Sequence, residues 1–328
     1  MQKQRLFYLD FVRAFATIVI LLTHYNAIYL WAGIPEKAVI TTRVCNLYIG
    51  DFGVSLFLII SGAALMYVYE EQLDLKTFYK KRFLNIFPMF WIAYVIAFLI
   101  NFYINGNVGD APKVNIIFSI LGIDQYLSAF GVKTFSLVGE WFLGFIMIVY
   151  ILFPLLRKGV NDYRKITMVI VGVIYVCSVM FLDQSYIITM RLPEILFGMI
   201  FVKYIKRVNS YVASLALVVC VLNTVLKPQF NGNLQTTYVG ICAFLILVFI
   251  AQYINCKVIK NICSMICKYS YPCFIVHHRI LLRVTSHFDI YTITKNQSVL
   301  VFLIGCCVVG VASWLLYQLE KKMKALCV

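Results

Sequence analysis

Apolar residues occur along the chain in long continuous runs that are separated by short polar segments. A run of about 20 apolar residues can cross the hydrocarbon core of a bilayer as an α-helix. The runs do not alternate apolar with polar residues, as the strands of a membrane β-barrel would. Ten membrane helices are predicted, at residues 7–31, 50–69, 83–105, 137–156, 166–183, 187–205, 209–226, 235–254, 265–283 and 297–318.

This pattern predicts an all-α fold, a polytopic membrane protein of about ten transmembrane helices. The sequence shows no linker, internal repeat or low-complexity tract, so residues 1–328 are expected to form a single integral-membrane domain. The first apolar run carries Arg13 and is longer than a signal peptide, and we expect it to remain in the mature protein. The segment 114–130 is broken by Gly122 and Asp124, which favours an interfacial or re-entrant piece over an eleventh span.

The composition supports the membrane class. Hydrophobic residues make up 62% of the chain and charged residues only 13%, against roughly 25% charged residues in a soluble domain. A soluble fold of this size needs more polar residues to cover its surface. Intrinsic disorder is excluded because it requires low hydrophobicity. A disulfide scaffold is excluded because the 11 Cys residues are about 3% of the chain, below the range of such scaffolds.

The net charge of +15 first suggests a nucleic-acid partner, but the positions of Lys and Arg give a simpler explanation. With the N-terminus in the cytoplasm, 19 of the 29 basic residues fall in cytoplasmic segments, nine fall on the opposite side, and Arg13 lies within a span. An excess of Lys and Arg is typical of cytoplasmic loops. Both termini are therefore predicted to be cytoplasmic, and no nucleic acid is expected as a partner.

Three ionisable residues lie in the first predicted helix: Asp10, Arg13 and His24. Such groups are costly inside a membrane and are functional candidates by default. Asp10 and Arg13 are three residues apart and can pair on one helix face. Arg13 and His24 are eleven residues apart, so they share a face at a separation of about 16 Å along the helix axis. The alternative is that Asp10 and Arg13 only neutralise each other near the interface and that His24 is a packing residue.

Further polar and aromatic candidates lie near the outer side or midway in a span. They are Asp51, Glu140, Trp141, Arg191, Glu194 and His277. Arg191 and Glu194 can pair because three residues separate them along a helix. Residues near helix ends are often interface residues, so a shared outer cavity is one of two interpretations. On the inner side, Lys80, Lys81 and Arg82 either set the topology or bind the phosphates of an anionic substrate.

The first helix carries a recognisable motif. Its sequence, RLFYLDFVRAFATIVILLTHYN, closely resembles the first helix of the membrane acyltransferase-3 family, in which an Arg is followed after ten residues by a His. Arg13 and His24 match these two positions. The next apolar segment, GDFGVSLFLIISGAAL, is similar to the family's second helix, with Ser61 and Gly62 in matching positions.

Later segments continue the resemblance in the same order, so that it covers about Arg5 to Lys322. The segment FYKKRFLNIFPMFW is similar to the basic start of the family's third helix, with Lys81, Arg82 and Trp91 in register. The remaining segments are EWFLGFIMIVYILFPLL, RLPEILFGMIF, YSYPCFIVHH and SWLLYQLEKK. One departure is Asn85, which stands where the family usually has a second Arg.

The resemblance implies transfer of an acyl group, usually acetyl, from cytoplasmic acyl-CoA to a sugar hydroxyl outside. His24 would act as general base on this hydroxyl, or would accept the acyl group transiently. The residues expected in the catalytic centre are His24, Arg13, Asp10 and Glu140. Those expected to bind the acyl donor are Lys81, Arg82, Ser61, Gly62 and Trp91. Those expected to bind the acceptor are Asp51, Trp141, Arg191, Glu194 and His277.

The same resemblance implies a location in the bacterial cytoplasmic (inner) membrane. Acetyl-CoA or another short acyl-CoA is expected as the donor, with no tightly bound cofactor and no metal. The expected partners are membrane lipids and a cell-surface glycan, and a homodimer is one option for the assembly. The sequence leaves open which acyl group is transferred. It also leaves open whether the acceptor sugar belongs to a capsule, a lipopolysaccharide, an exopolysaccharide or a glycolipid.

Two other classes of function remain at this point. A secondary transporter or flippase of a glycan precursor would need the same intramembrane charges, but its paired Gly or Pro breaks in two halves of the chain are not found. The third interpretation is a metal site made by Cys273, His277, His278 and His287. Neither Cys263 with Cys267 nor Cys306 with Cys307 has a standard zinc spacing.

Overall fold

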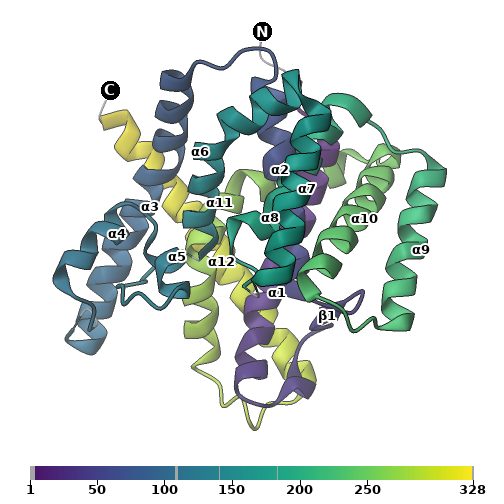
Figure 1. Ribbon diagram of the computed structural model, residues 1–328. Helices are drawn as coiled ribbons and strands as arrows, with labels where there is room; N and C mark the ends of the chain where they lie inside the picture. The colour runs from purple at the N-terminus through teal and green to yellow at the C-terminus, as the bar shows by residue number, and fades with distance from the viewer. Residues whose placement is uncertain (1–3, 108–109, 140, 183, 327–328) are drawn as a thin grey trace. The chain divides into compact units, whose positions relative to one another are not determined.

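The structure is a computed structural model, and it is predominantly helical (Figure 1). It describes residues 4–107, 110–139, 141–182 and 184–326. In these residues the only strands are β1 (Arg43–Val44) and β2 (Leu47–Tyr48), which form a short antiparallel hairpin with Arg43 opposite Tyr48. The predicted all-α fold class is confirmed.

The helices fall into two groups by length. The long helices are α1 (Phe7–Trp31), α2 (Ile49–Tyr69), α3 (Leu75–Asn105), α6 (Trp141–Asp162), α7 (Arg164–Phe181), α9 (Ser210–Leu226), α10 (Gly232–Tyr253), α11 (Lys257–Thr285) and α12 (Lys295–Leu326). The shorter ones are α4 (Ile116–Ile120), α5 (Asp124–Ala129) and α8 (Ile188–Ile200), and α8 continues into the π-helix η3 (Phe201–Ile205).

Seven helices of the described residues are long and apolar enough to cross a membrane. They are α1, α2, α3, α6, α7, α10 and α12. The other three predicted segments coincide with α8, α9 and α11, and α9 is an apolar helix of 17 residues. The chain is thus a multi-pass helical protein of the membrane class. The count of ten spans and the cytoplasmic position of both termini stay predictions.

Three predicted helix starts differ from the observed ones by four residues or more. The ninth predicted helix, α11, begins at Lys257 rather than at residue 265. The third helix begins at Leu75 rather than at residue 83, because the Asp74 side chain accepts a hydrogen bond from the backbone N–H of Thr77 at 2.8 Å and caps the helix. Hydrogen bonds from the Thr77 side chain and from its backbone N–H hold the pKa of Asp74 below its usual value. The fourth predicted segment begins its helix at Trp141 rather than at residue 137. Gly139 adopts a φ of +76°, which an α-helix cannot include.

The chain divides into two compact units, and each is described by itself. The first unit consists of Met1–Asn26, Ala38–Leu73 and Leu152–Lys268, and the second of Ala27–Lys37, Asp74–Ile151 and Tyr269–Val328. Helices α1, α6 and α11 contribute residues to both units. The single-domain organisation expected from the sequence stays a prediction.

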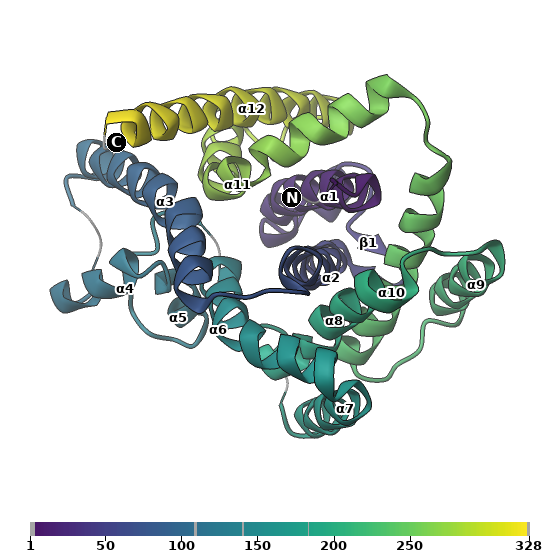
Figure 2. The same ribbon diagram turned by 90° about the horizontal axis from the view of Figure 1, so that it is seen from above.

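In the first unit, α2 is the central helix. It lies between α1 and α8, and α10 packs against both α2 and α9 (Figure 2). Leu58, Ile59 and Ile60 of α2 are completely buried. A helix that is apolar around most of its circumference is expected where neighbouring helices enclose it.

Two glycines bring α2 and α8 into backbone contact. A Cβ atom at Gly62 would overlap the carbonyl oxygen of Ile195, and a Cβ atom at Gly198 would overlap the carbonyl oxygen of Ile59. Each glycine therefore faces the backbone of the opposite helix. Small residues at such crossings allow the close helix packing that is typical of membrane proteins.

The second unit holds the segment that the sequence marked as too short for a span. This segment forms α4 and α5, which are separated by a turn at Gly122 with a φ of +68°. Two hydrogen bonds attach it to α3. The indole N–H of Trp91 donates to the carbonyl of Ile120 at 2.8 Å, and the Tyr94 hydroxyl donates to Ser119 Oγ at 2.8 Å. Helix α3 also packs against α12.

The glycine crossing predicts that a Gly→Ala substitution at the crossing and one away from it change the stability of the protein by different amounts. Gly198→Ala is expected to destabilise the protein by about 1–3 kcal/mol, since the new methyl group must displace the backbone of α2. In the described residues no atom lies within 4 Å of a Cβ at Gly172 on α7, so Gly172→Ala should cause no loss. Thermal unfolding of both variants in detergent measures the difference. Equal stability of the two variants would contradict the close crossing.

Candidate functional site

A group of three ionisable side chains, two of them buried, joins α2 to α8 in the first unit. Arg191 lies between two carboxylates, with its Nη2 at 3.3 Å from Asp51 Oδ1 and its Nη1 at 3.2 Å from Glu194 Oε1. Its Nε donates to the carbonyl of Ser185 at 2.9 Å. Arg191 and Glu194 have no exposed surface, whereas the Asp51 side chain is 38% exposed. The Arg191–Glu194 pair expected from the spacing therefore forms, and Asp51 extends it towards solvent.

The surroundings of this group explain how it is accommodated. The other carboxylate oxygen of Glu194 is buried beside the hydroxyl of Ser55 on α2. A Cβ atom at Gly240 of α10 would overlap that hydroxyl, so the glycine leaves the space that Ser55 occupies. Separating buried charges from their partners is strongly unfavourable. The group therefore fixes the position of the first turn of α2, where Asp51 lies.

Helix α1 carries Arg13 and His24 in the same unit, and both are half-buried. The C-terminal half of this helix packs on the start of α2. A Cβ at Gly53 would lie 2.9 Å from Val19 Cγ1, and a Cβ at Gly50 would lie 2.9 Å from Thr23 Cγ2. The turn of α1 that carries His24 thus lies beside the turn of α2 that carries Asp51.

Asp10 forms its ion pair with Arg5 rather than with Arg13. Arg5 precedes the start of α1 and reaches the first helical turn from outside, where it also donates to Ser264 Oγ at 3.1 Å. In the described part of the chain, no ion pair engages Arg13. Asp10, the partner predicted from the spacing, therefore does not neutralise the Arg13 guanidinium.

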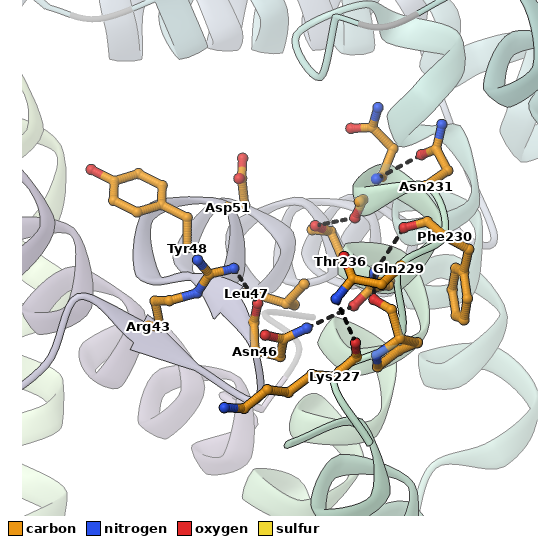
Figure 3. A pocket seen from close by; sticks show the side chains of 14 residues that line it. Arg43, Asn46, Leu47, Tyr48, Asp51, Lys227, Gln229, Phe230, Asn231 and Thr236 are labelled. Carbon is orange, nitrogen blue, oxygen red and sulfur yellow. Dashed lines mark hydrogen bonds between the residues drawn. The ribbon is translucent and has the colours of Figure 1, made fainter. Parts of the chain in front are cut away.

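A polar cavity opens next to Asp51, and all of its lining belongs to the first unit (Figure 3). Its volume is about 680 Å³, within the range of small-molecule sites. The β1–β2 hairpin, the first turn of α2, the segment 227–231 and the start of α10 form its walls. Lining side chains with polar or aromatic groups include Arg43, Tyr48, Asp51, Lys227, Gln229 and Phe230.

Side-chain amides hold the walls of this cavity together. Gln235 donates through Nε2 to the carbonyls of Pro228 at 3.0 Å and Phe230 at 2.8 Å. Asn223 donates to the carbonyl of Cys45 in the hairpin at 2.7 Å. Asn231 accepts hydrogen bonds from the first N–H groups of α10 and caps it. These bonds give the cavity a fixed shape.

Sequence reasoning found Asp51 but missed the other residues of this cavity. Arg43 and Lys227 were counted only as basic loop residues. The available signal was the segment KPQFNGNLQ, which places several amides between two apolar runs. Amides provide hydrogen-bond donors and acceptors without charge, so this segment was suited to line a polar site.

The residues expected to bind the acyl donor are divided between the two units. Ser61 and Gly62 belong to the first unit, where Gly62 serves the crossing with α8 and Ser61 donates to the carbonyl of Phe57 at 2.7 Å. Lys81, Arg82 and Trp91 belong to the second unit. Donor binding by any of the five stays a prediction.

Arg82 and Lys81 differ in their environment within α3. The Arg82 guanidinium carbon lies 5.5 Å from the ring centroids of both Phe78 and Tyr150. Such placement over aromatic faces is a cation–π interaction. Lys81 is exposed. The two aromatic rings hold the Arg82 side chain, while the ammonium of Lys81 is accessible to solvent.

Trp141 and His277 also lie in the second unit. His277 has no exposed surface, and its Nδ1 lies 3.1 Å from the carbonyl oxygen of Cys273 and 2.9 Å from that of Phe274. Two carbonyl acceptors require the proton to be on Nδ1. Trp141 packs edge-on against Phe145. Glu140, the fourth expected catalytic residue, lies outside the described residues.

Among the residues that the structure describes, no three His, Cys, Asp or Glu side chains gather closely enough to hold a metal ion. The metal interpretation of Cys273, His277, His278 and His287 therefore gains no support from the geometry.

The fold and this site define a multi-pass helical protein with charged and polar groups buried between its helices. The family model described as an acyltransferase domain matches residues 6–318, nearly the whole chain. The chain belongs to the acyltransferase-3 family, as its motifs predicted. No curated protein and no solved structure gives a significant match. Family membership supports acyl transfer as the activity.

The buried charge group predicts unequal effects of removing its members. Arg191→Met is expected to cost about 3–5 kcal/mol of stability, because it leaves the Glu194 carboxylate buried without its cation. The double variant Arg191→Met/Glu194→Met should be less destabilised than the sum of the two single variants. Denaturation in detergent, arranged as a double-mutant cycle, measures this coupling.

A matched control is Lys133→Met, which removes an exposed side chain that forms no ion pair in the described residues. Its loss should change stability by no more than about 0.5 kcal/mol. Strict additivity of the Arg191 and Glu194 substitutions would show that the pair contributes nothing as a unit.

Proposed function

We propose that the chain transfers an acetyl group from cytoplasmic acetyl-CoA to a hydroxyl of an extracytoplasmic cell-surface glycan. Family membership supports acyl transfer. The observation that favours this particular reaction is the position of His24, half-buried on α1 beside the turn of α2 that opens into the polar cavity. A base near a polar cavity suits the activation of a sugar hydroxyl.

In this proposal His24 acts as general base. One imidazole nitrogen takes the proton of the acceptor hydroxyl while the oxygen attacks the thioester carbonyl carbon. The new C–O bond forms, the C–S bond breaks, and the thiolate of CoA takes up the proton that His24 releases. In the second version of the reaction His24 first receives the acetyl group and then passes it to the hydroxyl. Both versions convert one thioester into one ester and leave His24 unchanged.

Arg13, Lys81 and Arg82 supply positive charge for the acyl donor in this account. CoA carries several phosphate oxygens, and guanidinium groups bind phosphate in bidentate fashion. Arg13 is suited to this role because it lies about 16 Å from His24 along α1 and is engaged by no ion pair in the described residues. We also propose that Glu140 takes part in catalysis and that Asp10 supports the basic end of α1.

We further propose a location in the bacterial cytoplasmic membrane, with acetyl-CoA bound only during turnover. Trp141 and His277 stay proposals for acceptor contacts, and Asp51, Arg191 and Glu194 are proposed to act on the acceptor through the cavity wall. Membrane lipids surround the apolar helices, and a homodimer is compatible with this account. Another short acyl group, such as succinyl, would use the same chemistry.

The proposal predicts that His24 and Arg13 are needed for acetylation. In cells that carry His24→Ala, O-acetylation of surface glycan should fall by about 100-fold or more, because a general base typically contributes this much. Arg13→Ala should also reduce it, by weakening donor binding. Mass spectrometry of the surface glycan measures the acetyl content and identifies the acyl group.

His287→Ala provides a matched control, since His287 is an exposed histidine after the end of α11. It should leave the acetyl content unchanged. Immunoblots of the membrane fraction show whether each variant is inserted normally. Full acetyl content in cells with normally inserted His24→Ala protein would overturn the proposed mechanism.

A further inference from the structure

The polar cavity of the first unit carries an excess of positive charge. Arg43 and Lys227 line it, and Asp51 is the only carboxylate among its lining residues. Asp51 is already paired with the buried Arg191. Arg191 is shared between Asp51 and Glu194, so Asp51 still contributes negative charge. The two basic side chains of the walls outnumber it, and the lining keeps a net positive charge.

Neither basic side chain has a protein counter-ion in the described part of the chain. Arg43 donates through Nη2 to the carbonyl of Asn46 at 2.9 Å, which holds the guanidinium over the hairpin (Figure 3). Lys227 follows the last residue of α9 and adopts a φ of 44°, so its backbone leaves the helix at the cavity wall. The cavity thus carries one guanidinium held by a hydrogen bond and one exposed ammonium, and both can bind an anion.

The rest of the lining is suited to sugar rings. Asn46, Gln229 and Asn231 place amide groups on the walls, and amides both donate to and accept from hydroxyl groups. Tyr48 and Phe230 add aromatic rings at different parts of the lining (Figure 3). Hydroxyl-bearing rings with one apolar face match such a combination of amides and aromatic side chains.

We propose that this cavity is the binding site for an acidic saccharide, with a sugar carboxylate bound by Arg43 and Lys227. The planar guanidinium of Arg43 matches a carboxylate in bidentate geometry, and the Lys227 ammonium adds a point charge. This inference rests on the proposed function, because it identifies the class of the acetyl acceptor. A neutral glycan would leave both charges without a partner.

The test measures saccharide binding by the full-length protein in lipid nanodiscs, without any acyl donor. The two probes are a tetrasaccharide of alternating glucuronate and N-acetylglucosamine, and the neutral tetrasaccharide of N-acetylglucosamine. At low salt the acidic probe should bind at least about tenfold more tightly, which corresponds to one charge-assisted contact. Raising the ionic strength should reduce this preference, because salt screens exposed charges.

Variants of the two basic residues locate the effect. Arg43→Gln and Lys227→Gln should each weaken binding of the acidic probe about three- to tenfold and leave the neutral probe unaffected. Lys227→Arg, which keeps the charge, should retain most of the binding. Lys133→Gln removes an exposed charge from a loop of the second unit and serves as the matched control. Unfolding temperatures of all variants confirm that each one folds.

Three results would each overturn the inference. They are equal affinity for the two probes, undetectable binding of both probes at millimolar concentration, and loss of the preference for the acidic probe in Lys133→Gln alone. These results do not depend on acyl transfer, because no donor is present. Acetylation of neutral glycans by the protein would contradict this inference and leave the proposed function intact. A clear preference for the acidic probe, together with full acetylation by the His24→Ala protein, would contradict the proposed function and leave this inference intact.

Discussion

Arg191 is a guanidinium without exposed surface, held between Asp51 on α2 and Glu194 beside it on α8. Moving such a charge out of water costs several kcal/mol unless its partners are close. The partners are close because α2 and α8 cross with their backbones in contact, and Gly62 and Gly198 make that contact sterically allowed. The charge group and the glycine crossing therefore depend on each other.

The position of the first turn of α2 follows from this arrangement. That turn packs against α1 near His24 and forms one wall of the polar cavity. Arg191 is shared between Asp51 and Glu194, and Arg43 and Lys227 give the cavity lining a net positive charge in spite of Asp51. The charge group between α2 and α8 thus contributes to the electrostatic character of the cavity, and with it to the kind of acceptor that we propose.

The sequence predicted the parts of the fold that follow from local patterns. All ten apolar runs fall on helices because length and continuous hydrophobicity decide the class of such segments. The helix starts at Leu75, Trp141 and Lys257 were missed. At the first two, a capping carboxylate and a glycine with positive φ act on single residues, whereas the prediction averaged hydrophobicity over a run. The i, i+3 rule correctly predicted the Arg191–Glu194 pair. The same rule predicted that Asp10 pairs with Arg13, but Asp10 pairs with Arg5 instead.

The candidate site was less predictable, because tertiary contacts assemble it. Asp51 and Arg191 are 140 residues apart in the sequence, and no spacing rule relates them. The cavity residues Arg43 and Lys227 come from two loops that read as ordinary basic connections. The family motif points to His24 and Arg13, which lie on one helix where the sequence fixes their separation, and their role stays a prediction.

The most direct measurement of the central claim is transfer of radiolabel from acetyl-CoA to glycan by the purified protein in proteoliposomes. The donor is supplied on the face that carries the N-terminus, and the acceptor glycan on the other. Our account predicts label that is covalently bound to the glycan, is released by mild alkali as expected for an ester, and is absent with His24→Ala. Movement of glycan across the membrane without covalent label would contradict the account and would indicate a transporter.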